Sequence, residues 1–101
     1  MYRYIELDKA LSNKKTIQKS YPKGVQNKLF RLVNDILTNS RNKVAIGKPE
    51  ELKYTDIEKW SRELTDKDRI VYSIEPSIQY NLPDDDEVVI FHQYLGHYRD
   101  K

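Results

Sequence analysis

The clearest hydrophobic pattern in the chain lies between Val25 and Leu37 and predicts an amphipathic helix. Apolar side chains recur there every three or four residues, the spacing that gathers them on one face of a helix. The stripe consists of Val25, Leu29, Leu32, Val33, Ile36 and Leu37. Phe30 is expected to widen it, and Pro22 to occupy the first helical turn. The polar run from Thr38 to Asn42 should end the helix.

The residues before this helix predict a strand and a weaker helix. Tyr2 to Leu7 is β-prone with partial alternation, which is typical of a short strand. Asp8 is a candidate N-cap for a helix that continues to about Ser20. Its apolar stripe is thin, because it consists of Leu11 and Ile17 alone. Tyr21-Pro22 then separates the two helices.

After Gly47 the pattern changes to short apolar stretches, which predict strands. These stretches are Leu52 to Tyr54, Lys59 to Leu64, Arg69 to Glu75 and Val88 to Leu95. The last is the longest and most apolar, so we expect it at the centre of the sheet. Thr65 to Asp68 should be a turn, and Pro76 to Glu87 a long connection between two strands.

This order of elements predicts an α+β fold, with two N-terminal helices packed on one face of an antiparallel-rich sheet. The 101 residues suffice for one domain, residues 1–101, with one core and one site. The absence of cysteine excludes disulfides and thiolate metal sites. No stretch reaches the roughly 20 apolar residues of a membrane span, and no signal peptide is recognisable. We therefore expect a cytoplasmic protein.

Charge is distributed unevenly along the chain. Residues 1–50 hold eleven Lys and Arg against four Asp and Glu, whereas residues 51–101 hold seven against twelve. The resulting charges are +7 and −5, although the whole chain carries only +2. A basic half suits a polyanion such as RNA. On charge alone, a lysine-rich solvated helix surface explains the asymmetry as well.

The candidate chemistry lies in the second half of the chain. The segment from Gly47 to Lys53 reads Gly-Lys-Pro-Glu-Glu-Leu-Lys, and Trp60-Ser61-Arg62, Arg69-Ile-Val-Tyr72 and His97-Tyr98 follow it. These segments supply a carboxylate, cations, an imidazole and a phenol. Metal-independent RNA cleavage needs a base for the 2′-hydroxyl, cations for the phosphate and an acid for the leaving oxygen. The set is therefore sufficient for that reaction.

The order and spacing of these segments resemble the YoeB (Txe) toxins of the RelE superfamily, bacterial ribosome-dependent mRNA endoribonucleases. The resemblance extends from about Val25 to Tyr98. It implies that Glu50 is the base, that Arg69 supports the phosphate and that His97 is the general acid. Tyr98 would orient or stack on the substrate. The two further cations expected to bind substrate are Lys53 and Arg62.

The same resemblance implies partners and products. The ribosome would present mRNA in its A site, and no cofactor or metal would be required. A cognate antitoxin of the YefM type would cover the basic surface, and a toxin homodimer can form within that complex. Attack by the 2′-hydroxyl would leave a 2′,3′-cyclic phosphate and a 5′-hydroxyl.

The residues given catalytic roles also have ordinary structural explanations. Without the motif, Glu50 would be a loop residue, Arg69 an exposed strand arginine and His97 a solvated histidine. We expect Trp60 to lie in the core and His92 to be structural. Two rival functions share this fold: a non-catalytic binding toxin such as the gyrase-directed ParE type, and a structural or regulatory protein that binds an antitoxin and DNA without killing cells.

The chain departs from the family pattern at four places, one of which is the Pro76–Glu87 connection, longer and more acidic than usual. Glu63 stands where the family usually has a second arginine after Trp-Ser. Gly96 precedes His97 where an aromatic residue is common. Arg99, Asp100 and Lys101 extend past the tyrosine that usually ends the chain. These changes are expected to alter efficiency or target choice.

Overall fold

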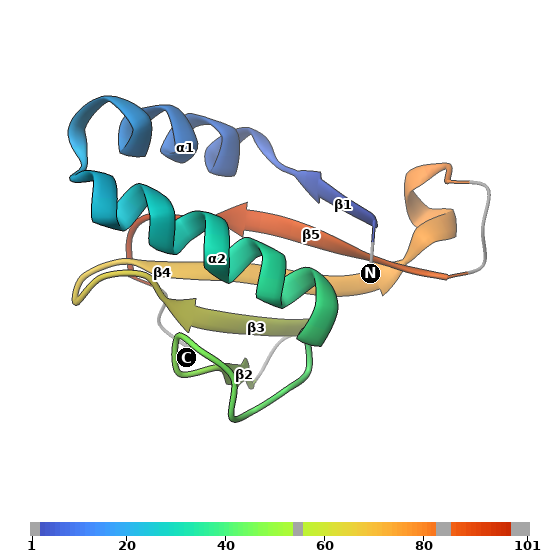
Figure 1. The fold of residues 1–101 in the computed structure, drawn as a ribbon. Coiled ribbons are helices and arrows are strands. Elements are labelled where there is room, and N and C mark those ends of the chain that lie inside the picture. Colours follow the sequence, from blue (N-terminus) through green and yellow to red (C-terminus); the bar gives the residue numbers. More distant parts are fainter. Residues whose placement is uncertain (1–2, 54–55, 83–85, 98–101) are drawn as a thin grey trace.

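Five strands form one mixed sheet in the order β1-β5-β4-β3-β2 (Figure 1). The computed structural model describes residues 3–53, 56–82 and 86–97. Its elements are β1 (Arg3–Glu6), α1 (Asp8–Ser20), α2 (Lys23–Asn39), β2 (Glu50–Leu52), β3 (Glu58–Glu63), β4 (Arg69–Pro76), the 3₁₀ helix η1 (Ser77–Tyr80) and β5 (Glu87–Gln93). Only the β1–β5 pair is parallel among these neighbours. The predicted α+β class is confirmed.

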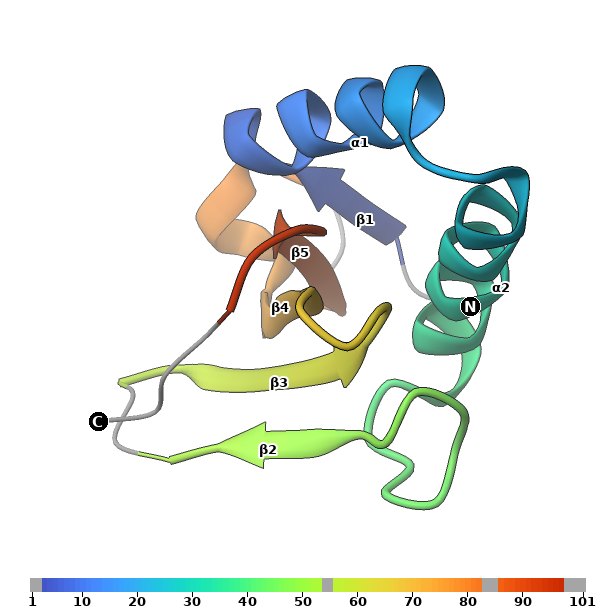
Figure 2. The same cartoon turned by 90° about the vertical axis from the view of Figure 1, so that its left-hand side faces the viewer.

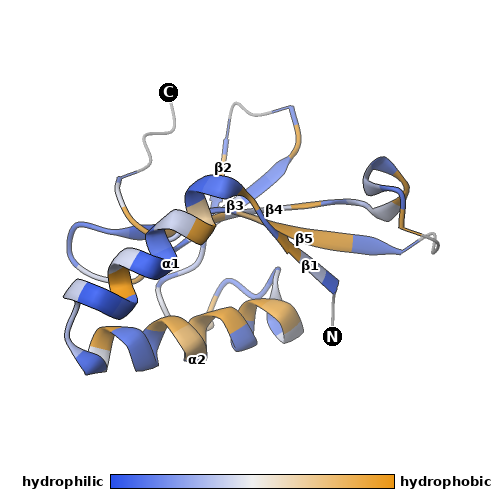
Figure 3. Cartoon of the chain, turned by 90° about the horizontal axis from the view of Figure 1, so that it is seen from above, coloured by the Kyte–Doolittle hydropathy of each residue, from blue (hydrophilic) through white to orange (hydrophobic). Residues whose placement is uncertain are grey.

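Both helices cover the same face of the sheet, as predicted (Figure 2). Because side chains alternate along a strand, every second sheet residue points towards the helices. One continuous core joins residues of α1, α2 and the sheet: Ala10, Ile17, Leu29, Leu32, Ile36, Leu37, Trp60, Leu64, Ile70, Tyr72, Ile74, Val89, Phe91 and Tyr94. Figure 3 shows apolar segments along α2 and β5, whereas α1 is largely hydrophilic.

The opposite face of the sheet, here called the second face, carries the alternate residues. On β3 and β4 these are Ser61, Arg69, Val71 and Ser73. The register pairs Glu50 of β2 with Ser61, and Ser61 with Val71. Glu50 therefore belongs to the second face, since directly paired residues of neighbouring strands share a face.

Several local predictions were wrong at the level of single residues. Phe30 is 71% exposed instead of widening the buried stripe, because it lies about 100° around the helix from Leu29. Asp8 is the first helical residue and Leu7 the N-cap, without a side-chain capping bond. Pro22 is the N-cap of α2 and not part of its first turn.

The strand predictions needed two corrections. β4 lies at the centre of the sheet, whereas β5 lies between β4 and β1. β2 begins at Glu50 and ends at Leu52, which moves it two residues towards the N-terminus. Tyr2 and Tyr54, which the sequence placed in strands, lie outside the described residues. Within the described ranges, no helix is long and apolar enough to cross a membrane.

Candidate functional site

A tight turn before β2 determines where Glu50 is placed. Gly47 has φ +82° and Lys48 has φ +50°, both in the left-handed region. A Cβ on Gly47 would lie 2.7 Å from a methyl group of Leu32 and 3.3 Å from the Glu63 carbonyl, so any other residue at this positive φ would be strained. The Gly47 carbonyl accepts the N–H of Glu63 at 2.6 Å. The turn thereby fixes β2 beside β3, with Glu50 exposed opposite Ser61.

Arg69 is tied to both sides of this turn. Its Nε donates to Ser61 Oγ at 2.9 Å, and its Nη2 donates to the Lys48 carbonyl at 3.2 Å. A guanidinium has five N–H donors, so the two bonds fix its orientation and leave capacity to bind an anion. Ser61 thus connects the position of Glu50 with that of Arg69.

The structure holds the segment before His97 directly against Arg69. The Arg69 N–H donates to the Gly96 carbonyl at 2.9 Å, and the Gly96 N–H donates to Asp68 Oδ1 at 2.8 Å. Gly96 has φ +98°, a conformation that favours glycine over the aromatic residue common in the family. His97 itself is exposed. Arg69 and the backbone that carries His97 are therefore brought together.

Two amide side chains that the sequence analysis missed also hold this segment. Asn13 Oδ1 accepts the N–H groups of Tyr94 and Leu95 at 3.0 and 3.1 Å. Gln93 Nε2 donates to the carbonyls of Leu95 and Gly96 at 3.0 and 3.2 Å. Asn13 lies about 80 residues away in the chain, on α1. No sequence spacing connects it with His97, so only the tertiary structure identifies it.

The carboxylate of Asp68 is the charged group that holds the segment before His97 in place. Burial would raise the pKa of its carboxyl group. Hydrogen bonds from Gly96, Thr65 and Tyr21, together with the charge of His97, outweigh burial and hold the pKa below its ordinary value. Thr65 Oγ1 donates to Asp68 Oδ2 at 2.7 Å, and the Tyr21 hydroxyl donates to the same oxygen at 3.1 Å. The ionised carboxylate thus joins the turn, the helices and the C-terminal segment.

We expect Asp68→Asn to destabilise the protein at pH 7 by about 1–3 kcal/mol, the range for hydrogen bonds to a charged group. A lowered folded-state pKa stabilises the native state above the unfolded value, near 3.9 for Asp. That stabilisation is lost as the pH falls through the folded pKa, so the variant and wild type should converge in acid. Urea unfolding at pH 7 and pH 3 measures this. Asp66→Asn, an exposed carboxylate in the same turn, is the matched control and should behave as wild type at both pH values.

Arg62, predicted to bind substrate, is instead fully buried on the helix face. Its guanidinium pairs with Asp35 of α2 and donates to the carbonyls of Asn39 at 2.8 Å and Ile46 at 3.3 Å. The Asn39 carbonyl belongs to the last residue of α2, where helical carbonyls lack intrahelical partners. Arg62 therefore caps this helix and does not reach the surface. Its assignment as a substrate-binding residue was wrong.

The other predicted residues have simpler positions. Lys53 is exposed just beyond β2, and with Glu50 it lines a shallow depression of about 760 Å³ along that strand. Glu63, the acidic departure from the family, lies 3.6 Å from the ammonium of Lys48 as an ion pair. Tyr98 lies outside the described residues. No group of three or more His, Asp or Glu side chains in the described residues could hold a metal ion.

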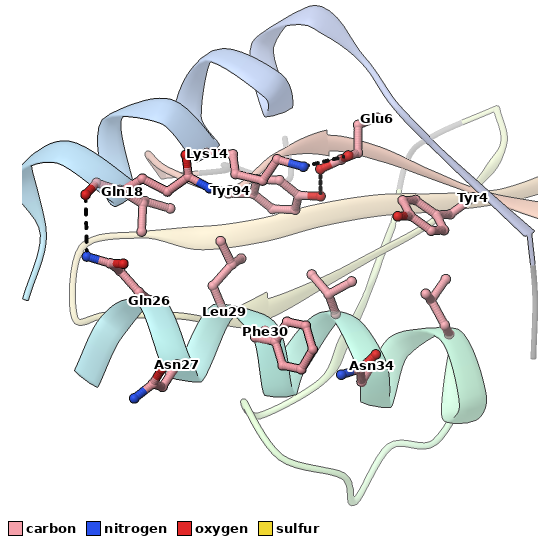
Figure 4. A pocket seen from close by; sticks show the side chains of 13 residues that line it. Tyr4, Glu6, Lys14, Gln18, Gln26, Asn27, Leu29, Phe30, Asn34 and Tyr94 are labelled. Atoms are coloured by element: carbon pink, nitrogen blue, oxygen red, sulfur yellow. Dashed lines mark hydrogen bonds and ion pairs between the residues drawn. The ribbon is translucent and has the colours of Figure 1, made fainter. Parts of the chain in front are cut away.

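A separate groove lies between the helices and the β1 edge of the sheet (Figure 4). Its volume is about 550 Å³. Phe30 and Tyr4 border it, and both side chains are half exposed or more. At its inner wall the Tyr94 hydroxyl donates to Glu6 at 2.6 Å, and Lys14 pairs with the same carboxylate at 2.9 Å. The groove contains none of the predicted catalytic residues and lies on the helix side of the sheet.

Comparison with solved structures supports the fold at low sequence identity. The YoeB dimer from Staphylococcus aureus matches with a TM-score of 0.71 and 24% identity, over 96% of this chain and 98% of that one. The YoeB/ParE toxin from Agrobacterium tumefaciens matches with a TM-score of 0.75 and 22% identity, over 95% and 99%. The YoeB–YefM heterotetramer from Staphylococcus aureus matches with a TM-score of 0.69 and 24% identity, over 97% and 99%.

Comparison with curated proteins gave no significant match. The sequence of residues 9–98 does match the family described as YoeB-like toxins of bacterial type II toxin–antitoxin systems. That span includes α2, all but the first residue of α1 and every predicted catalytic position. The chain therefore belongs to the YoeB-like toxin family.

Proposed function

We propose that this toxin is a ribosome-dependent mRNA endoribonuclease that cleaves by attack of the RNA 2′-hydroxyl. One observation carries the proposal: Arg69 is bonded to Ser61, opposite Glu50, and to the backbone of Gly96, next to His97. Arg69 is thus tied to Ser61, the residue paired with Glu50, and to the residue before His97, although these segments are far apart in the sequence. A carboxylate, a guanidinium and an imidazole form the set that phosphodiester transfer requires.

In the proposed reaction, Glu50 removes the proton of the 2′-hydroxyl. The 2′-oxygen then bonds to the adjacent phosphorus, and Arg69 stabilises the negative charge of the pentacoordinate phosphate, with Lys53 as a second cation. His97 gives a proton to the departing 5′-oxygen as its bond to phosphorus breaks. The products are a 2′,3′-cyclic phosphate and a 5′-hydroxyl. Tyr98 is proposed to orient or stack on the substrate.

The exposure of the site supports a role for the ribosome. Glu50 and His97 are both exposed, and the depression beside Glu50 is shallow. Correct orientation of the reacting groups supplies a large part of catalysis. On such a shallow surface, much of the orientation of a flexible RNA strand must come from another molecule. A ribosome that holds the codon in its A site would supply it. The proposed reaction accordingly takes place in the cytoplasm, where mRNA is translated.

The direct test is incubation of the purified toxin with programmed ribosomes, followed by mapping of the RNA ends. We expect cleavage within the A-site codon that leaves a 2′,3′-cyclic phosphate and a 5′-hydroxyl, and little cleavage of free mRNA. Growth arrest without new RNA ends would favour a non-catalytic binding toxin. Absence of both would favour a regulatory protein.

Arg69→Ala is expected to lower the cleavage rate constant on pre-formed toxin–ribosome complexes more than it weakens ribosome binding. The reason is that Arg69 stabilises charge that develops only in the transition state. Single-turnover cleavage and a binding assay separate the two effects. Lys23→Ala and Lys28→Ala, on the basic helix α2, should instead weaken association and reduce its salt dependence. If Arg69→Ala lost binding alone, Arg69 would be a docking residue.

We further propose a YefM-type antitoxin as the partner, and a toxin homodimer within their complex. The YoeB–YefM heterotetramer and the YoeB dimer are among the similar structures, and the first fifty residues of this toxin carry a charge of +7. A disordered acidic segment that orders on contact suits this surface. Its carboxylates can pair with Arg69 or Lys53 and so compete with the RNA phosphate.

Removal of the C-terminal segment of the cognate antitoxin should therefore abolish neutralisation and leave the DNA binding of the antitoxin intact. Co-expression growth assays, RNA cleavage in the presence of each antitoxin form and an operator-binding assay measure these effects. Full protection by the truncated antitoxin would place inhibition elsewhere on the toxin.

A further inference from the structure

His92 is a β-bulge residue on the second face of the sheet, since its neighbour Phe91 belongs to the core on the helix side. Val71 pairs with Gln93 and Tyr72 pairs with Phe91, so His92 is an extra residue of β5 without a partner in β4. Bulges of this kind redirect one side chain, and they are common beside active sites. His92 Nε2 lies 2.8 Å from Ser73 Oγ. Ser73 faces away from the helix side, since its neighbours Tyr72 and Ile74 belong to the core.

A chain of hydrogen bonds fixes the protonation pattern of the His92 ring. Ser73 Oγ donates to one oxygen of Glu75 at 2.5 Å, and the Tyr80 hydroxyl donates to the other at 3.0 Å. The single hydroxyl proton of Ser73 is used in this way, so Ser73 must accept from His92. Nε2 therefore carries a proton. Within the described residues Nδ1 makes no hydrogen bond, and it is the ring nitrogen left for a ligand.

This arrangement is built into the sheet and is not a chance surface contact. Ser73 is fully buried and Glu75 is 7% exposed, whereas His92 is partly exposed. A buried carboxylate requires hydrogen-bond partners, and here both of its oxygens have one. The buried residues hold the imidazole in one orientation, and the ring itself reaches the surface of the protein.

A lysine lies close to the imidazole. Lys59 of β3 pairs directly with Ser73 in the sheet register, and it therefore lies on the second face. Burial and the positive charge of Lys59 lower the pKa of His92, and the charge of Glu75 raises it less strongly. Burial and the lysine charge thus both favour the neutral form of the ring in the ligand-free protein. An anion bound beside Lys59 and His92 would remove the unfavourable interaction and favour the protonated ring.

The position of this pair relative to the proposed cleavage site identifies the anion. Lys59 is two residues along β3 from Ser61, which binds Arg69. Two residues of a strand span about 6.6 Å, comparable to the step between neighbouring phosphates of an RNA strand. An RNA that places its reacting phosphate at Arg69 can therefore place the adjacent phosphate at Lys59 and His92.

We propose that His92 and Lys59 form a second phosphate-binding subsite for the RNA strand, one nucleotide step from the reacting phosphate. The inference rests on the proposed ribonuclease function. Glu75, Ser73 and Tyr80 act as positioning residues, because they reach the RNA only through the orientation of His92. The proposal adds a binding role to the structural role that the sequence predicted for His92.

The test uses the His97→Gln protein, in which His92 is the only histidine. An RNA trinucleotide with 2′-O-methyl groups serves as an uncleavable probe. NMR should show that millimolar probe raises the pKa of His92 by about one unit, a tenfold change in its protonation equilibrium. Inorganic phosphate should act in the same direction at higher concentration.

Two further variants separate binding from structure. Lys59→Gln should raise the pKa of ligand-free His92, because it removes the lysine charge, and should weaken probe binding severalfold. Lys67→Gln, an exposed lysine in the Thr65–Asp68 turn, should change neither quantity. A merely structural His92 predicts no effect of the probe on its pKa.

The outcomes distinguish this inference from the proposed function. Probe-induced shifts at the Arg69 side chain with an unchanged His92 would overturn the subsite and leave the ribonuclease proposal standing. Shifts at neither residue would overturn the subsite as well. A His92 response combined with absence of cleavage by wild-type toxin on ribosomes would support an RNA-phosphate site and reject catalysis.

Discussion

Glu50→Gln and His97→Gln should each reduce mRNA cleavage on ribosomes by about 10²–10⁴-fold, the usual contribution of a general base or acid. Glutamine keeps the approximate size of both side chains and removes the ability to exchange the proton at neutral pH. Both residues are exposed, so the unfolding transition of each variant should remain close to that of wild type. Single-turnover cleavage at saturating toxin measures the chemical step.

A matched control comes from the next residue of β2. Glu51 is also exposed, but it pairs with Trp60 and so belongs to the other face of the sheet. Glu51→Gln should cleave like wild type. Near-normal cleavage by a folded Glu50→Gln protein would remove Glu50 from the mechanism, and the corresponding result for His97→Gln would require another acid.

Arg62→Ala is expected to destabilise the fold by about 3–5 kcal/mol, the cost of removing one partner of a buried ion pair. The substitution deprives Asp35 of its counter-charge and removes one of the two donors to the last carbonyl of α2. It also opens a cavity where a completely buried side chain stood. Urea unfolding at pH 7 gives the difference in the free energy of unfolding.

The comparison variant is Arg41→Ala. Arg41 makes paired hydrogen bonds of 2.8–3.0 Å with Glu58 and Glu87, but its side chain is 42% exposed. Exposed ion pairs contribute up to about 1 kcal/mol, so its loss should cost far less than that of Arg62. An Arg62→Ala protein of normal stability that bound RNA weakly would restore the substrate role that the sequence suggested.

Local patterns were sufficient to predict most of the elements. The 3.6-residue period that defines α2 is a property of neighbouring residues, and it appears in the structure as one buried face with Leu29, Leu32 and Ile36. The strands near Lys59, Arg69 and Val88 followed from short apolar runs in the same way. Their order then identified two helices on one face of the sheet, because few compact arrangements bury that many apolar faces.

The identity of the catalytic candidates also came from sequence, through the spacing of motifs. Glu50, Arg69 and His97 were chosen from the order of the segments that contain them. The structure adds the physical connection: Ser61 bonds Arg69 opposite Glu50, and Gly96 bonds Asp68 and Arg69 beside His97.

Strand register, which depends on residues far apart in the chain, decided what sequence could not. Arg62 and Arg69 look equivalent as strand arginines, yet their side chains lie on opposite faces of the sheet. Arg62 is therefore a buried helix cap, whereas Arg69 is a surface cation. The pairing of β4 with β5 brings His92 to Ser73, and Asn13 reaches Tyr94 from a helix at the other end of the chain. Sequence determined which residue types and elements this toxin possesses. Only tertiary structure determined which side chains meet, because a shift of one residue in pairing would turn each strand side chain to the other face.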